Sequence, residues 1–326
     1  MLSRRSGAFD ATLSSLIFSF GFIATKWAIA YWSPLATVSL RLAIGATGGL
    51  ILALVMRQLP HVKSHLKVAF VPGLLISADL LCLAAGLRVT TVSNGVFISS
   101  IYVVLIPFMS GFKIFSLSGL RHLSFVALAL LGMAFITDFS SISLSTQGDL
   151  LCLFSAICNA CYIVTLERSA SRIKSPLAFN AAQLLWGSLI TGICCLFLPH
   201  DNPMQGSLPM AIVGILIVGI LSSSVATWLQ IRGQLKIGAL AASLFCLLDA
   251  PFATLFGILI LSEHLTVYKV IGAMIIVTAS AGQFYFDLRK KKRAEAQEQA
   301  SATSPIPISE MLVESEELPA QRRAAR

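Results

Sequence analysis

Ten runs of about 20 apolar residues follow one another through most of the chain, and a helix of that length crosses the hydrocarbon core of a bilayer. Lipid offers no hydrogen-bond partner to a backbone, so a spanning segment must satisfy its polar groups internally, as a helix does. The sequence therefore predicts an all-α integral membrane protein with ten transmembrane helices. They are expected at residues 11–32, 35–56, 67–87, 91–112, 121–138, 148–167, 177–198, 208–230, 237–261 and 267–287.

The composition excludes an ordinary soluble domain. Hydrophobic residues make up 56% of the chain and charged residues 12%, whereas soluble domains carry about 45–50% apolar and about 25% charged residues. The net charge of +9 comes from Lys and Arg at the ends of the apolar runs and in the tail. This distribution does not form a nucleic-acid-binding face, so no nucleic-acid partner is expected.

The loop charges predict the orientation. With the N-terminus in the cytoplasm, the outer loops and helix ends hold only Arg88 and Lys269. The inner loops hold many more basic residues, as the positive-inside rule expects. These are Arg57, Lys63 and Lys67; Lys113 and Arg121; Arg168, Arg172 and Lys174; and Arg232 and Lys236. Both termini are therefore expected in the cytoplasm, with residues 288–326 as a disordered cytoplasmic tail that begins at a basic run.

An internal repeat divides the apolar part of the chain. The sequence Ser-Pro-Leu-Ala at residues 33–36 recurs at residues 175–178, and Gly45 recurs as Gly187 at the same offset. Each copy opens the second helix of a five-helix unit. Because five is odd, the second unit crosses the membrane in the opposite sense, and inverted repeats place a substrate site between the halves. We therefore expect repeats at residues 1–147 and 148–287.

Two predicted spans carry polar groups that a helix in contact only with lipid does not need, because unmatched polar groups in hydrocarbon cost several kcal/mol. We interpret these spans as walls of a central site. The fourth span contains Asn94, Ser99, Ser100, Tyr102 and Pro107, and the ninth contains Ser243, Asp249 and Pro251.

Four ionisable residues lie within the predicted spans, at Lys26, Arg41, Asp79 and Asp249. Intramembrane charges are rare, face inward and mark substrate or proton pathways. The alternatives are a structural Arg41–Asp79 ion pair and a Lys26 that snorkels to the interface. Because Pro251 cannot donate to the carbonyl of Leu247, the helix is loosened beside Asp249. Asp249 is our candidate proton carrier, with recognition of a substrate amine as the rival role and Asp79 as the next candidate.

Uncharged polar and aromatic residues are weaker candidates. Gln183 occupies the position of Arg41 in the second repeat, and Trp186 and Trp228 lie within spans where their rings can stack on a substrate. For residues such as Asn94, Ser99, Tyr102 and Gln183, hydrogen bonding between helices is the competing interpretation.

Motifs for other chemistry are absent from the sequence. It contains no GxxxxGK[ST] loop, no GxSxG elbow and no HExxH pair, so the chain cannot hydrolyse ATP by itself and shows no hydrolase signature. Cys158 and Cys161 form a lone CxxC in an apolar run, whereas zinc sites need four ligands. No enzyme activity, cofactor or metal is expected.

Four sequence segments, taken in order, resemble the drug/metabolite transporter superfamily, in particular its ten-helix EamA-type members. Together the resemblance covers roughly residues 11–287. The segments are Phe18-Ser-Phe-Gly-Phe22 followed by Lys26; Pro34 followed by Arg41; Ala85-Gly-Leu-Arg-Val-Thr-Thr91 through Pro107; and Pro251 through Leu261-Ser-Glu-His-Leu-Thr266 and Gly272.

The first repeat departs from the family pattern, because Ser116–Gly119 stands where a closing Glu is usual. This suggests that Glu263, the counterpart in the second repeat, is a loop cap or an outer gate. The resemblance implies secondary transport, commonly export of amino acids, other metabolites or toxic compounds, across a bacterial inner membrane. A membrane-embedded enzyme and a non-transporting receptor or scaffold are the alternatives. The expected partners are a small-molecule substrate, the lipid bilayer and a coupling proton. Assembly into a homodimer is left as an open alternative.

Overall fold

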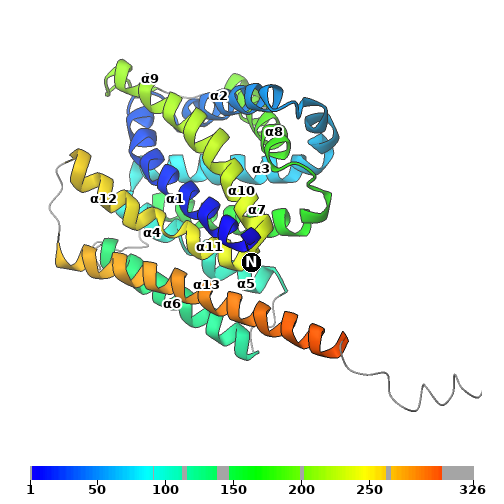
Figure 1. Ribbon diagram of the computed structural model, residues 1–326. Coiled ribbons are helices and arrows are strands. Elements are labelled where there is room, and N and C mark those ends of the chain that lie inside the picture. Colours follow the sequence, from blue (N-terminus) through cyan, green and yellow to red (C-terminus); the bar gives the residue numbers. More distant parts are fainter. Residues whose placement is uncertain are drawn as a thin grey trace, which may run out of the picture. The chain divides into compact units, whose positions relative to one another are not determined.

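The computed structural model describes residues 2–90, 92–111, 116–137, 147–198, 202–261 and 266–302, and the regular elements in these ranges are all helices (Figure 1). In this described part, nine helical stretches are long and apolar enough to cross a membrane, and Gly95–Met109 is a shorter apolar helix in place of the fourth predicted span. The predicted all-α architecture is confirmed. The chain divides into two units, Met1–Gln283 and Phe284–Arg326.

The helices follow the predicted order. They are α1 (Leu2–Ile29), α2 (Pro34–Val55), α3 (Leu59–Val89), α4 (Val92–Ser99), α5 (Tyr102–Met109), α6 (Leu117–Thr137), α7 (Gln147–Arg168), the 3₁₀ turn η2 (Ala170–Arg172), α8 (Pro176–Phe197), α9 (Leu208–Leu216), the π-helix η3 (Ile217–Ala226), α10 (Thr227–Ile237), α11 (Ala239–Cys246), α12 (Asp249–Leu261) and α13 (Val267–Ala302).

Both ends of the apolar part differ from the prediction. Helix α1 begins at Leu2, so residues 2–10 extend the first helix. Helix α13 continues to Ala302, so residues 288–302 are helical, contrary to the predicted disorder of the tail. This stretch is rich in Ala, Glu, Gln, Lys and Arg, which are strong helix formers. The remainder of the tail, residues 303–326, lies outside the described residues.

The repeated Ser-Pro-Leu-Ala sequence forms the same helix start twice. The hydroxyl of Ser33 accepts a hydrogen bond from the backbone N–H of Ala36 at 3.2 Å, and that of Ser175 accepts from Ala178 at 3.2 Å. A serine at this position satisfies a free N–H of the first turn, and the proline after it has no N–H to leave unpaired. The two copies therefore begin α2 and α8 in the same way.

The halves interlock through corresponding helices: α1 packs on α10, α3 on α7, and α2 on α8. A Cβ placed on Gly233 would lie 2.9 Å from the carbonyl oxygen of Gly7, and one placed on Gly86 would lie 2.9 Å from that of Gly148. Only glycine allows backbones to approach so closely. The first helix of each repeat thus crosses the third helix of the other, which fits two inverted five-helix repeats.

An ion-pair cluster lies beside the crossing of α1 and α10. Asp10 of α1 is buried and pairs with Arg232 and, at 2.9 Å, with Lys236, both on α10. The Lys236 ammonium also donates to the hydroxyl of Ser6 at 2.8 Å. The cluster ties a helix of the first repeat to a helix of the second.

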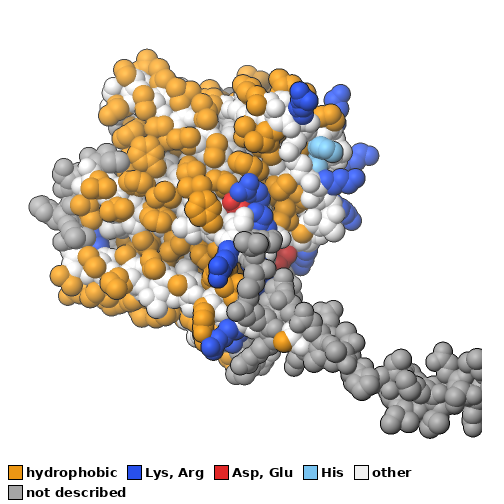
Figure 2. Space-filling model, viewed as in Figure 1, with side chains coloured by type: hydrophobic (Ala, Val, Ile, Leu, Met, Phe, Trp, Pro, Cys, Tyr) orange, Lys and Arg blue, Asp and Glu red, His pale blue; other side chains and the backbone are white. Residues whose placement is uncertain are grey.

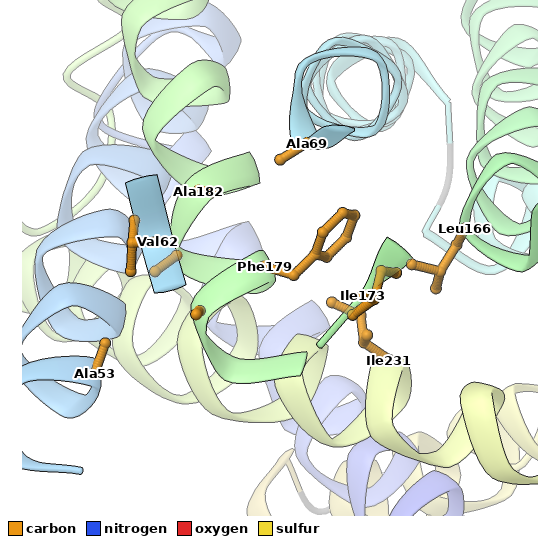
Figure 3. Close-up of a cluster of buried hydrophobic side chains, with 10 residues drawn as sticks. Ala53, Val62, Ala69, Leu166, Ile173, Phe179, Ala182 and Ile231 are labelled. Atoms are coloured by element: carbon orange, nitrogen blue, oxygen red, sulfur yellow. The ribbon is translucent and has the colours of Figure 1, made fainter. Parts of the chain in front are cut away.

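Apolar packing fills the space among α2, α3, α7, α8 and α10. Phe179 of α8 is fully buried and points into the space among Ala69, Leu166 and Ile173 (Figure 3). Its ring also meets the ring of His65 edge to face, with 6.1 Å between centroids. Apolar side chains also cover most of the surface visible in Figure 2, as a surface in contact with lipid requires.

Both polar spans are broken in the middle. The fourth consists of α4 and α5, separated at residues 100–101, and the ninth consists of α11 and α12, separated at residues 247–248. As expected from the missing N–H of Pro251, the carbonyl of Leu247 accepts a hydrogen bond from the N–H of Ala250, at 3.3 Å. The eighth span contains the π-helix η3, and π-helical turns often occur at functional sites.

Candidate functional site

A cavity of about 140 Å³, here named the central cavity, lies among helices of both halves. Among the described residues it is lined by α1, α2, α3, α4, α5, α7, η3, α10, α11 and the start of α12. Six of the residues predicted from the sequence line it together: Arg41, Asp79, Ser99, Ser100, Tyr102 and Asp249.

Arg41 comes from α2, a little over two turns from its start. Its Nε donates to the hydroxyl of Ser223, in the π-helix η3, at 2.9 Å. Although the structure describes both side chains, Arg41 forms no salt bridge within 4.0 Å of Asp79. The two charged groups are thus not in direct contact in this structure, and the guanidinium retains donors for a ligand.

Asp79 comes from α3 and is held by the second half. The hydroxyl of Ser155 on α7 donates to its Oδ1 at 2.5 Å. This bond orients the carboxylate on the cavity wall. Arg41 and Asp79 thus present opposite charges to the same small space, each oriented by a serine of the second repeat.

Asp249 lies at the start of α12, beside the break in the ninth span. Its Oδ1 is buried without a hydrogen-bond partner among the described residues. The N-terminal end of a helix carries partial positive charge and stabilises an acid in its first turn. A buried carboxylate oxygen without a partner is costly, so this group is suited to bind a proton or a ligand donor.

Tyr102 and Ser99 complete the wall from the broken fourth span. The Tyr102 hydroxyl donates to the carbonyl oxygen of Ser243 at 3.5 Å, which links the fourth span to the ninth. The Ser99 hydroxyl donates to the carbonyl of Val96 in its own helix at 3.0 Å. Asn94 was predicted on the same wall, but its side chain lies outside the described residues, as does Glu263.

The other predicted site residues do not line the described part of the central cavity. Gln183 lies behind it and donates to the hydroxyl of Tyr162, a cavity residue, at 3.2 Å. The Trp186 indole donates to the carbonyl of Leu66 at 2.8 Å, and the Trp228 ring lies under the guanidinium of Arg232 at 5.1 Å. These contacts are typical of packing. Lys26 lines a second cavity of about 600 Å³.

The wall of the central cavity that α7 forms was not predicted from the sequence. Ser155, Asn159 and Tyr162 of α7 all line the cavity. Their spacings of four and three residues place them on one face of a helix. A search for polar residues at helical spacing would have found this wall.

The central cavity therefore combines one guanidinium, two carboxyl groups, several hydroxyls and the side-chain amides of Asn159 and Gln230, and most of its remaining lining is apolar. Among the described residues, no group of three or more His, Cys, Asp or Glu side chains could hold a metal ion. The arrangement can bind a small molecule that carries both a negative and a positive group.

Known proteins are similar to this chain in sequence and in fold. The EamA-like transporter family matches residues 5–138 and again residues 146–284. An uncharacterized transporter of Archaeoglobus fulgidus is 27% identical over 268 residues, which covers 82% of each chain. The uncharacterized transporter YcxC of Bacillus subtilis is 27% identical over 183 residues, 52% of this chain and 56% of that one.

The fold also matches a solved protein crystal structure at 16% sequence identity, with a TM-score of 0.70, over 88% of this chain and 98% of the other. The family match runs twice through almost all of the membrane-spanning part, in register with the two halves that enclose the cavity. The chain therefore belongs to the EamA-like transporter family.

Proposed function

We propose that the protein is a secondary active transporter that exports small zwitterionic metabolites, such as amino acids, by alternating access. The observation that carries this proposal is that Arg41 and two acids, Asp79 and Asp249, line one cavity between the halves. A zwitterion offers a carboxylate to the guanidinium and an ammonium group to a carboxylate. Its apolar side chain then contacts residues such as Phe22 and Leu83.

The roles of the three charged residues follow from their surroundings. The planar fork of Arg41 suits bidentate binding of a carboxylate. Asp79, oriented by Ser155, binds the substrate ammonium group. Asp249 is the proton carrier, because its buried Oδ1 lacks a hydrogen-bond partner among the described residues and is available to a proton. Its position beside the break between α11 and α12 lets it meet water in only one state of the transport cycle.

The orientation is part of the same proposal. Both termini face the cytoplasm of a cell with the protein in its inner membrane, and the repeats comprise residues 1–147 and 148–287. The excess of Lys and Arg in the inner loops supports this arrangement. The twofold match of the family at residues 5–138 and 146–284 supports a boundary between residues 138 and 146, close to the proposed one.

The test is transport by the purified protein in proteoliposomes. A panel of radiolabelled amino acids, organic acids and amines is loaded, and efflux is measured with and without a pH gradient. We expect efflux of at least one zwitterion, accelerated by a gradient that supplies external protons. Arg41→Gln and Asp79→Asn should each reduce this efflux. Transport of uncharged compounds alone, unaffected by either substitution, would contradict the proposal.

A further inference from the structure

The second cavity adjoins the central one but has a different character. Its volume is about 600 Å³, and among the described residues its walls come from α1, α4, α6, α9 and the segment before it, α12 and the first turn of α13. Phe22 and Val96 line both cavities, and Ala250 of its wall follows Asp249 of the central cavity. A molecule that passes between the two cavities therefore passes Phe22 and Val96.

The charged residues of its described lining are both lysines, Lys26 of α1 and Lys269 of α13. They stand in an otherwise largely apolar wall that includes Trp27, Met133 and Ile136, with three hydroxyl residues among them. A wall of this kind matches a ligand with one negative group and an apolar body.

Lys26 lines this cavity from α1. It faces an open-sided space that α6, α12 and α13 border. Its ammonium makes no hydrogen bond or salt bridge to any side chain that the structure describes, although the residue is exposed to the cavity.

Lys269 reaches the same cavity from another helix. It lies in the first turn of α13, which begins at Val267. The N-terminal end of a helix carries partial positive charge and stabilises a nearby anion. An anion bound between Lys269 and Lys26 therefore meets both this helix end and the ammonium of Lys26.

We propose that the second cavity is a binding site for an organic anion with an apolar body. This inference rests on the proposed function. The anion is the carboxylate end of the transported substrate, bound on its way to or from Arg41. Lys26 and Lys269 bind the carboxylate, and the wall around Trp27 and Met133 receives the apolar part. The substrate class narrows accordingly to carboxylates with an aromatic or aliphatic side chain.

The test measures binding of 3-phenylpropionate and of its uncharged amide to the purified full-length chain in detergent by isothermal titration calorimetry. The carboxylate should bind more tightly than the amide, and the difference should shrink in high salt. Lys26→Gln and Lys269→Gln should each weaken carboxylate binding about fivefold, the effect of a partly exposed charge pair. Lys26→Arg, which keeps the charge, should restore most of it. Lys63→Gln, an exposed lysine on α3 away from both cavities, is the matched control and should change nothing.

The Arg41→Gln variant distinguishes binding in the second cavity from binding in the central cavity. The carboxylate preference should survive Arg41→Gln, whether or not that variant transports. If the preference is lost in Arg41→Gln and kept in both lysine variants, the anion binds only in the central cavity and the second site does not exist. Equal affinity of acid and amide in the wild-type chain would also overturn the inference.

Discussion

Replacing Asp10 by asparagine is expected to destabilise the protein more than removal of any exposed charge. The Asp10 side chain is 1% exposed, whereas its partners Arg232 and Lys236 are 37% and 27% exposed. Removing one member of a fully buried ion pair costs about 3–5 kcal/mol, and exposed pairs contribute about 0–1 kcal/mol. Because water reaches both cations here, the expected cost lies between these ranges, at about 2 kcal/mol.

Thermal unfolding in detergent, followed by tryptophan fluorescence, measures this loss. For a protein of this size, about 2 kcal/mol lowers Tm by about 3 °C. Lys63→Gln, which removes an exposed charge, is the control and should leave Tm unchanged. Residues of one network couple, so Asp10→Asn combined with Arg232→Gln should cost less than the two single changes added. A Tm for Asp10→Asn equal to that of the control would show that the cluster does not hold α1 to α10.

Three further predictions concern transport and topology. Arg41→Lys should weaken substrate binding with Tm unchanged, because an ammonium cannot reproduce the planar fork of the guanidinium. If Arg41→Gln lowers Tm, and adding Asp79→Asn restores Tm while transport stays intact, the two residues form a structural pair instead. Asp249→Asn should abolish efflux driven by a pH gradient and spare substrate-for-substrate exchange, and gradient-driven efflux that persists in this variant would exclude Asp249 as the coupling acid. In a chain without its native cysteines, a cysteine at Asn202 should react with an impermeant maleimide added outside intact cells and one at Lys63 should not; the reverse labelling would invert the proposed orientation.

Helix number and the repeat could be predicted from the sequence because both depend on local properties. Apolar length alone predicts a spanning helix, and Ser33 and Ser175 cap their helices through atoms only three residues away. Arg41, Asp79 and Asp249 could be found because an ionisable group in lipid is costly wherever it lies. Their meeting in one cavity follows from the packing of both halves.

The parts that could not be predicted depend on contacts distant in sequence. Asp10 was expected in a polar leader before the first helix, and its role depends on Arg232 and Lys236, more than 200 residues later. Trp186 was predicted to stack on a substrate, but its indole donates to the Leu66 carbonyl. This partner could not be predicted, because it belongs to another helix. The π-helix η3 was also missed, because its three consecutive serines, Ser222–Ser224, mark a polar face but do not distinguish π-helical from α-helical hydrogen bonding.

The crossing of α1 with α10 has a consequence for biosynthesis. Helix α1 leaves the ribosome first, yet its partner follows only after roughly 200 further residues, which takes roughly 10–40 s at about 5–20 residues per second. Throughout this interval Asp10 lacks both of its cations, and the face of Gly7 has no helix against it. Neither half can complete its packing alone, so the newly made chain must wait in the membrane, partly assembled, until most of the second half has been inserted.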